Sequence, residues 1–416
     1  MAKKKIAYLQ FPGSNTENET KNILLKHGMS PRGHFWNEST EKLKYYDGFI
    51  ILGGFSFEDR SRSGIIASLE PVVNELKNQA LLGKPVLGIC NGAQILVESG
   101  LVPGNEKFET LVSLTDNKRV VGDRIVGTGY FNKWCYIKPS ENTKSAFIKK
   151  NGKPMRVPIA HAEGRFLFNK DLESEILQNS LIAYKYCDSE GNLSNDFPIN
   201  PNGSLHSAAA LSNLAGNVMA IMPHPERTLQ NEADDIFESM KNYIDSNSKF
   251  SYKALNFESK KISLKKFNKS PKTKELLVST IIADNEAASV EKCINSLGVK
   301  AKVKKYIHFE IDSVDSLDIN SIISTDVLFN PSKEYIAKLT HNSGVRRFLV
   351  RSKDDIVGQS LSQTLQDRFD LSGLKSIKRG VVWEVEINSG STKKDVDLIL
   401  NSHIFSNPIS QECHEY

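Results

Sequence analysis

Three side chains of this 416-residue chain have the types that thiol-based acyl transfer requires: Cys90, His224 and Glu226. A cysteine is a strong nucleophile, an imidazole can act as its base, and a carboxylate can orient that imidazole. Such a triad is defined by its geometry and not by its order along the chain. The sequence must therefore also supply elements that bring these three side chains together.

Cys90 follows the apolar run 85–89, and glycines stand two residues before and two residues after it, at Gly88 and Gly92. A buried strand that turns sharply into a helix would present the cysteine at its tip, where helix amides favour a thiolate and can hold an oxyanion. Glycines suit such a turn because it leaves no room for Cβ atoms. The alternative is a buried core cysteine. The flanking glycines favour the nucleophile.

His224 lies between Pro223 and Pro225, directly after the apolar run 217–222, and Glu226 comes two residues later. The prolines stiffen this segment and favour extended geometry, which places His224 and Glu226 on the same side. A lone surface histidine is the alternative interpretation. The two prolines and the nearby carboxylate favour a functional histidine.

The first part of the chain alternates apolar strands with helical segments. We expect strands at 6–11, 47–52, 85–89 and 217–222, helices at 17–27 and 68–82, and a β-rich segment at 106–215. This alternation predicts an α/β fold with a parallel sheet that is covered on both faces. Functional loops then gather at the carboxyl ends of the strands, where Gly54, Cys90 and His224 all fall.

These motifs resemble those of the class I (triad) glutamine amidotransferases, through Gly88-Ile-Cys-Asn-Gly-Ala-Gln94 and Pro223-His-Pro-Glu226. Four further segments are similar to the glutaminase subunits of phosphoribosylformylglycinamidine synthase: Phe11-Pro-Gly-Ser-Asn15, Gly53-Gly-Phe-Ser56, Ile159-Ala-His-Ala-Glu-Gly-Arg165 and Asn202-Gly-Ser204. The resemblance covers about residues 4–246. It implies a flavodoxin-like α/β fold with a parallel or mixed sheet and helices on both faces.

The resemblance also implies a mechanism. Cys90 would attack the glutamine carboxamide, His224 would protonate the leaving ammonia, and water would release glutamate from the thioester. Backbone amides near Gly54 and of Asn91 would hold the oxyanion. Gln94, one helical turn beyond Cys90, stands at the family's glutamine-binding position.

Three more residues are candidates on weaker grounds. His161 fits a structural role as well as a substrate or interface role. Arg60 and Arg62 belong to a segment that is more basic than is usual in the family, and we consider them for substrate or interface contacts. The chain also departs from the family at Thr16, where cysteine is common, and at Glu58, where glycine is usual.

Composition limits the class of protein. The five cysteines are scattered without metal-ligand spacing, which predicts no metal site, no disulfide framework and a cytoplasmic location. No apolar run is long enough to span a bilayer, and the first run is interrupted at Gln10, too early for a signal peptide. We therefore expect no membrane partner.

Residues 248–274 are rich in lysine and serine. A lysine-rich run can bind nucleic acid or an anionic membrane. This one has no arginine cluster and little aromatic interleaving, and it lies between two regions that look folded. We interpret it as a solvated linker and expect no nucleic acid partner.

The last third of the chain repeats one pattern. Strand, helix and strand are expected at 276–282, 287–297 and 303–311, and again at 348–351, 358–369 and 381–387. Each copy ends in an Asn-Pro pair, and the pairs lie about 77 residues apart, which predicts two small α+β units of the β-α-β-β-α type. Each copy resembles the small bridging subunit of the same synthase, which works as a dimer.

The predicted organisation is a glutaminase domain at 1–247, a linker at 248–274, and bridging repeats at 275–342 and 343–416. The resemblance implies that ammonia made here amidates formylglycinamide ribonucleotide in purine biosynthesis. This chain would need no cofactor, and ATP and magnesium would bind the large synthetase subunit as its partner. Two alternatives are a glutaminase that serves another synthetase, and a regulatory scaffold whose C-terminal repeats sense a ligand.

Overall fold

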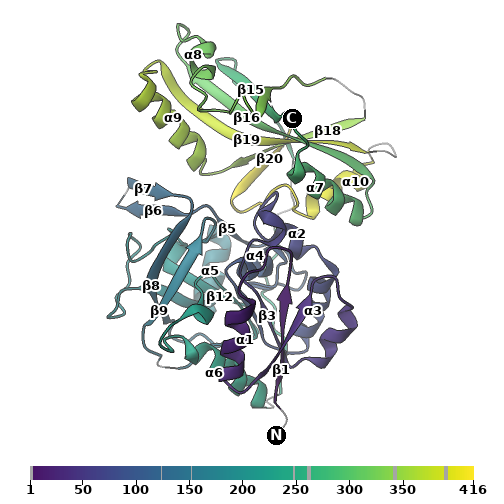
Figure 1. The fold of residues 1–416 in the computed structure, drawn as a ribbon, viewed down its shortest axis with the longest axis vertical. Coiled ribbons are helices and arrows are strands. Elements are labelled where there is room, and N and C mark those ends of the chain that lie inside the picture. Colours follow the sequence, from purple (N-terminus) through teal and green to yellow (C-terminus); the bar gives the residue numbers. More distant parts are fainter. Residues whose placement is uncertain are drawn as a thin grey trace. The chain divides into compact units, whose positions relative to one another are not determined.

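The computed structural model describes residues 3–122, 124–150, 152–246, 249–259, 264–340, 344–387 and 392–416. The chain divides into two units, Met1–Lys260 and Lys261–Tyr416 (Figure 1). Each unit has a sheet and a hydrophobic core of its own. The expectation of an α/β unit followed by a smaller sheet-containing unit is confirmed.

The first unit is built on a nine-stranded mixed sheet with the strand order β2-β1-β3-β4-β13-β12-β11-β8-β9. The first five strands in this order are parallel to one another, and the pairs that follow are antiparallel. The central strands β3, β4 and β13 are buried along their whole length, as parallel strands covered on both faces should be. The strands are β1 (Lys5–Gln10), β2 (Ser30–Phe35), β3 (Gly48–Ile51), β4 (Val86–Ile89), β8 (Phe131–Pro139), β9 (Met155–His161), β11 (Ile182–Cys187), β12 (Ala208–Ser212) and β13 (Val218–Ile221).

Helices cover both faces of this sheet. Helix α1 (Glu17–Lys26) connects β1 to β2, and α3 (Pro71–Leu81) connects β3 to β4. Since β2 and β4 lie on opposite sides of the β1–β3 pair, right-handed crossovers place these two helices on opposite faces. The helix expected at 68–82 is split, because Pro71 begins α3 and a short α2 (Ile65–Ser68) precedes it. The other helices are α4 (Asn91–Glu98), α5 (Lys170–Gln178) and α6 (Asp234–Asp245).

Two small sheets lie outside the main one. Strand β5 (Val112–Thr115) pairs with β10 (Arg165–Phe168) in antiparallel fashion. Strands β6 (Lys118–Val121) and β7 (Arg124–Thr128) form a hairpin that belongs to no larger sheet. Figure 1 shows β6 and β7 standing apart from the main sheet of their unit.

The second unit contains a seven-stranded sheet with the order β14-β20-β18-β19-β16-β15-β17. The two long central strands β16 and β19 pair antiparallel from Ala301↔Ile387 to Asp312↔Ser376. The first copy adds β15 and β17 on one side of this central pair, and the second copy adds β18 and β20 on the other side. The elements are β14 (Lys265–Lys266), β15 (Thr273–Thr280), α7 (Asn285–Ser296), β16 (Ala301–Ser313), α8 (Ile319–Ile323), β17 (Glu334–Ile336), β18 (Val345–Ser352), α9 (Ile356–Phe369), β19 (Leu374–Ile387), α10 (Lys393–Asn401) and β20 (Gln411–Glu415).

The order of elements within each copy differs from the expected β-α-β-β-α type. Both copies run β-α-β-α-β, in which a long strand of 13 residues in β16 or 14 residues in β19 is followed by a helix, α8 or α10, before the last strand. The two long strands pair with each other over nearly their full length, so neither needs to turn back on itself. A short strand, β17 or β20, closes each copy.

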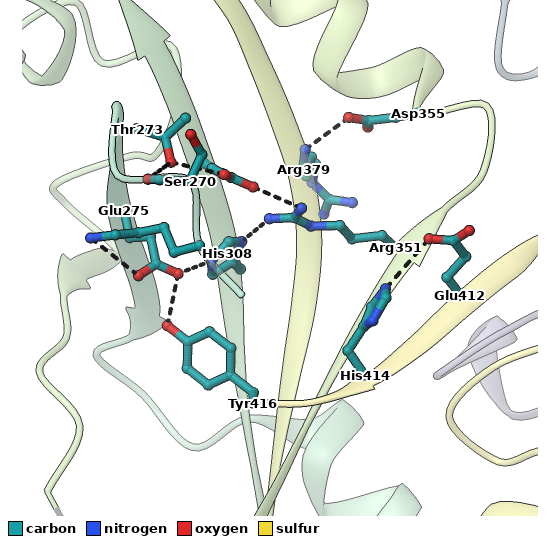
Figure 2. Close-up of polar contacts among 12 residues, drawn as sticks. Ser270, Thr273, Glu275, His308, Arg351, Asp355, Arg379, Glu412, His414 and Tyr416 are labelled. Atoms are coloured by element: carbon teal, nitrogen blue, oxygen red, sulfur yellow. Dashed lines mark hydrogen bonds and ion pairs between the residues drawn. The ribbon is translucent and has the colours of Figure 1, made fainter. Parts of the chain in front are cut away.

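A buried polar cluster lies on one face of this second sheet (Figure 2). His308 is fully buried; its Nε2 lies 2.7 Å from a Glu275 oxygen and its Nδ1 lies 3.3 Å from Nη2 of Arg351. A guanidinium can only donate, so Nδ1 accepts and Nε2 carries the proton. Arg351 also pairs with Glu310 at 2.8 Å, and the Tyr416 hydroxyl donates to Glu275 at 3.2 Å. These contacts link strands β15, β16 and β18.

The lysine-rich segment contacts the first unit before residues 260–263 and the second unit after them. Residues 260–263 themselves lie outside the described ranges. Before them, the Leu255 amide donates to the Gly104 carbonyl oxygen at 2.9 Å, and Phe257 packs against the core of the first unit. After them, β14 pairs with β20, and the Phe267 ring stacks on Tyr416. The structure divides the chain inside the predicted linker 248–274.

Candidate active site

Cys90 stands at the junction of β4 and α4, as the sequence predicts. Its backbone is strained, with φ 52° and ψ −105°, and its side chain is nearly buried. The flanking glycines allow this turn. A Cβ on Gly92 would lie 2.2 Å from the Ile51 carbonyl oxygen, and a Cβ on Gly88 would lie 2.4 Å from the Gly92 carbonyl oxygen. Only glycine permits the strand and the helix to approach so closely.

His224 and Glu226 follow β13, the strand that pairs with β4. The Nδ1 atom of His224 lies 2.6 Å from an oxygen of Glu226. Burial by itself would lower the pKa of His224, but the Glu226 carboxylate and the Cys90 sulfur outweigh it and raise that pKa to about 10. The Cys90 amide donates to the carbonyl oxygen of Ile221, the last residue of β13, so the nucleophile is bonded directly to the strand that precedes His224. The structure thus brings all three residues of the predicted triad together.

A glycine loop after β3 forms another wall of the site. Gly54 has φ +142°, and a Cβ there would lie 2.3 Å from the Gly13 carbonyl oxygen. The Gly53 amide donates to the Thr16 hydroxyl at 3.1 Å, so threonine supports the loop at the position where the family often has cysteine. Within the part of the chain that the structure describes, the amides of Gly54 and Asn91 have no hydrogen-bond acceptor. Free amides of this kind suit a developing oxyanion.

Asn91 and Gln94 hold the loops around the nucleophile. The Asn91 side-chain oxygen accepts from the Ser56 amide at 3.0 Å, and its nitrogen donates to the Gln94 side-chain oxygen at 3.0 Å. The Gln94 nitrogen in turn donates to the Glu163 carbonyl oxygen at 2.7 Å. One short network therefore joins the glycine loop, helix α4 and the loop after β9.

The two arginine candidates lie in a strained turn between β3 and α2. Arg60 pairs with the exposed Glu58 at 3.0 Å. Arg62 forms an ion pair with Glu98 on α4, and both of these side chains are largely buried. Arg62 thus has a clear structural partner beside α4. Arg60 lies nearer the surface, in contact with a residue at which the chain departs from the family.

Two partly buried acidic residues near this turn, Asp59 and Glu163, had not been singled out from the sequence. Burial raises the pKa of Asp59 to about 6. Burial, with further contributions from Asp116 and Asp59, raises the pKa of Glu163 to about 7. Glu163 belongs to the motif that contains His161, so the sequence motif could have indicated it as a site residue. Asp59 hydrogen-bonds the Asn91 side chain at 3.2 Å, a contact that no local pattern reveals.

Asn117 is a further residue that the sequence did not indicate. Its side chain is fully buried; the nitrogen donates to the carbonyl oxygens of His161 at 2.7 Å and Gly129 at 3.0 Å, and the oxygen accepts from the Gly164 amide at 3.0 Å. These bonds distinguish the oxygen from the nitrogen of the Asn117 side chain. The atom that lies 3.1 Å from Nδ1 of His161 is therefore the oxygen. Since an amide oxygen can only accept, Nδ1 of His161 carries the proton and Nε2 is a bare acceptor.

His161 is therefore held as a neutral ring in one tautomer. Burial, with the nearby His224 adding to it, lowers the pKa of His161 to about 3. Its Nε2 atom is buried and has no hydrogen-bond partner among the described residues. A buried acceptor without a donor is unusual in proteins and is often found where a ligand supplies the partner.

Two further features are absent from the described ranges. No group of three or more histidine, cysteine, aspartate or glutamate side chains is arranged there to hold a metal ion. No helix in those ranges has both the length and the apolar character needed to cross a membrane.

Comparison with known proteins agrees with this geometry. Residues 3–257 match the family of CobB/CobQ-like glutamine amidotransferase domains. The chain belongs to this family. The amidotransferase is 38% identical to the phosphoribosylformylglycinamidine synthase subunit PurQ of Methanothrix thermoacetophila, over 58% of this chain and 98% of that protein. It is 36% identical to the PurQ subunit of Methanocaldococcus jannaschii, over 58% of this chain and 97% of that protein.

A solved structure is also similar to this amidotransferase. A chain in the structure of PurLQS from Thermotoga maritima is 27% identical, with a TM-score of 0.46, and the match covers 58% of this chain and 100% of that chain. The family predicted from the sequence is confirmed by the family match and by the two PurQ relatives. The chain is thus an enzyme of the glutamine amidotransferase type.

Proposed function

We propose that this chain is the glutaminase component of phosphoribosylformylglycinamidine synthase and supplies ammonia for purine biosynthesis. The observation that carries the proposal is the Cys90–His224–Glu226 arrangement, in a chain that matches PurQ subunits over almost their whole length. An unrelated buried cysteine would have neither the strained strand-to-helix turn nor the histidine–carboxylate pair beside it.

The chemistry follows from the positions of the side chains. The Cys90 sulfur attacks the carboxamide carbon of glutamine, and the resulting oxyanion accepts hydrogen bonds from the amides of Gly54 and Asn91. His224 gives its proton to the departing nitrogen, which leaves as ammonia. A water molecule, deprotonated by His224, then attacks the thioester and releases glutamate. Glu226 orients the imidazole and stabilises its charged form throughout.

Two residues would bind substrate or product. Gln94 is buried beside Asn91, one helical turn beyond the nucleophile, and we assign it to glutamine binding on its resemblance to the family's glutamine-binding position. His161 presents a bare Nε2 acceptor, which suits a nitrogen-bearing donor such as the carboxamide or the ammonia formed from it. We assign Arg62 a structural role through Glu98, and we leave Arg60 as a candidate for interface contacts.

The ammonia would pass to a separate synthetase subunit that converts formylglycinamide ribonucleotide to formylglycinamidine ribonucleotide. ATP and magnesium would bind that subunit, and the complex would work in the cytoplasm without a cofactor in this chain. The second unit would act as the bridge. Its two copies share one sheet through β16 and β19, which is how a dimer of a small subunit could be contained in one chain. The domain boundaries predicted from the sequence remain part of this proposal.

The test is glutamate release from glutamine by the full chain, with and without the large synthetase subunit, its nucleotide substrate and ATP. We expect low activity alone, strong stimulation by the partner, and no activity for Cys90→Ser under either condition. Cys135→Ser, the same change at another buried cysteine, is the matched control and should keep its stimulation. Glutaminase activity that ignores this synthetase would point to another acceptor enzyme. Glutamine that survives under every condition would support the scaffold alternative.

A further inference from the structure

The β6–β7 hairpin exposes apolar side chains that nothing in its own unit covers. Val121, Ile125 and Val126 are 46%, 40% and 54% exposed, and Tyr130, just beyond the hairpin, is 56% exposed. A two-stranded hairpin is marginal in water unless it packs on something else. Apolar residues gathered on one projecting element, and not scattered singly, are typical of an interaction surface.

The same surface carries unbalanced positive charge. Residues 118–133 contain four basic residues and one acidic residue, Asp123, which lies outside the described ranges. Arg119, Arg124 and Lys133 pair with no carboxylate in the described part of the chain. Arg119 is instead held rigid: its guanidinium lies 4.6 Å from the centre of the Phe131 ring, and it donates to the Thr128 carbonyl oxygen.

We give the name hairpin surface to the exposed residues Val121, Arg124, Ile125, Val126, Tyr130 and Lys133, together with the partly buried Arg119. Its chemistry fits an acidic protein surface with an apolar centre. Protein interfaces are enriched in arginine, tyrosine and apolar groups at their core. A nucleic acid would use the cations, but it would leave three exposed aliphatic side chains without a stacking partner.

The root of the hairpin is tied directly to the glutaminase site. The Asn117 amide donates to the Ala162 carbonyl oxygen at 2.8 Å, and its side chain bonds Gly129 at the other end of the hairpin. The same side chain holds His161 and Gly164, and the Glu163 carbonyl oxygen between them accepts from Gln94. A shift of the hairpin can therefore move Gln94 through the buried Asn117 side chain and the loop that contains Glu163.

We propose that the hairpin surface docks on an acidic face of the synthetase subunit, and that Asn117 transmits docking to the loop that holds His161 and Gln94. This inference rests on the proposed function, because that function supplies the partner. Docking would favour one arrangement of the loop, and a ligand that binds one arrangement better shifts the population toward it. Asn117 acts here as a positioning residue.

The test measures the dissociation constant of the full chain for the purified synthetase subunit, and the stimulation of glutamate release. The double variant Val121→Asp with Val126→Asp should bind ~tenfold more weakly or worse, because it places charge in the apolar centre opposite an acidic face. The matched control Leu82→Asp changes a residue that is 69% exposed on another surface and should bind like the wild type. Alkylation of Cys90 by iodoacetamide without the partner should be unchanged in both variants.

Asn117→Ala tests the link from the hairpin to the site. It should bind the synthetase with an unchanged dissociation constant and lose most of the stimulation, with a lower kcat and a changed pH profile. Because this variant removes a buried hydrogen-bonding group, hydrogen exchange in the wild-type chain provides a second measurement. The amide of Gly164, which donates to Asn117, should change its exchange rate when the synthetase binds and not when albumin is added.

Each outcome decides something. If the Val121/Val126 double variant binds and is stimulated like the wild type, the docking surface is wrong and the proposed function stands. If the wild-type chain neither binds nor responds to the synthetase, both proposals are overturned. Binding of a single-stranded oligonucleotide to the hairpin surface in place of the synthetase would also overturn the docking proposal. Unchanged exchange at Gly164 on binding would remove the role of Asn117.

Discussion

A carboxylate oxygen of Glu226 lies 2.6 Å from Nδ1 of His224, and the two side chains are 0% and 3% exposed. Glu226 accepts a hydrogen bond from Nδ1–H of His224, which leaves Nε2 of the ring for Cys90. The sequence predicts an extended segment here, but after β13 the chain forms a single 3₁₀ turn, Pro225–Arg227, that begins directly after His224 and contains Glu226. The geometry of the pair therefore depends on two residues of one short loop. This relationship makes the pH dependence of the enzyme predictable.

Glu226→Gln should move the alkaline limb of kcat to lower pH. The pKa of His224 is raised to about 10, so the imidazolium that protonates the leaving ammonia is retained up to that pH. Without the Glu226 carboxylate, only the Cys90 sulfur opposes the effect of burial, so the pKa of His224 falls. Stabilisation of the fold by the charged pair is complete below about pH 6.5 and disappears as the pH rises through 10.

We expect kcat at pH 9 to fall by ~10²-fold or more in this variant, measured as glutamate release in the presence of the synthetase. Glu232→Gln, at a partly exposed carboxylate beyond the loop that accepts from the Gln230 amide, is the control. An alkaline limb that stays near pH 10 in Glu226→Gln would show that another group sets the pKa of His224.

Gly92→Ala should destabilise the first unit. The added Cβ would lie 2.2 Å from the Ile51 carbonyl oxygen, which is backbone and cannot turn aside. Overpacking of this kind costs about 1–3 kcal/mol in unfolding free energy. Thermal unfolding followed by circular dichroism measures the loss, with Gly344→Ala as the control because no atom lies within 4 Å of its added Cβ. An equal melting temperature for both variants would contradict the close packing of β3 against α4.

Asn91→Ala should lower kcat and leave KM for glutamine nearly unchanged. The Asn91 side chain accepts from the buried Ser56 amide and so holds the glycine loop that carries the Gly54 amide. Small displacements of such groups reduce rates by ~10²-fold. Steady-state kinetics with the synthetase present provide the measurement. Asn78→Ala, which removes an exposed hydrogen bond to Glu75 on α3, should have no effect. A rise in KM alone would instead assign Asn91 to glutamine binding.

Glu275→Gln should weaken the second unit and make its stability less dependent on pH in the acidic range. The hydrogen bond from His308 holds the pKa of Glu275 below its usual value, although burial opposes this. A carboxylate with a lowered pKa stabilises the fold above its unfolded pKa, and this contribution disappears as the pH falls through the folded pKa.

The expected loss is about 1–3 kcal/mol at pH 7, measured by hydrogen exchange of β15 and β16 amides in the full chain. Glu386→Gln, at an exposed position of β19, is the control. If wild type and Glu275→Gln lose protection in parallel as the pH falls from 6 to 3, the Glu275–His308 bond does not provide this stabilisation.

Much of the site could be predicted from the sequence because its signals are local. Cys90 with glycines on both sides, and His224 between two prolines, each carry their structural context within a few residues. Asn117 carries no such signal: it is one asparagine between two strands, and its four hydrogen-bond contacts come from residues 12 to 47 positions away. The repeat pattern likewise predicted two copies, but the joining of the two copies into one sheet depends on the pairing of β16 with β19.

The sequence by itself determined the α/β alternation and the family, and it predicted Cys90, His224 and Glu226 as a triad, because apolar periodicity, glycine and proline act through the local backbone. Tertiary structure alone decided the protonation of His224 and the tautomer of His161, since both follow from burial and from neighbours distant in the chain. It also decided that the lysine-rich segment adds β14 to the second sheet and that Asn117 joins the hairpin to the site. Hydrogen bonds between distant segments need both partners in place, and only the folded chain brings them there.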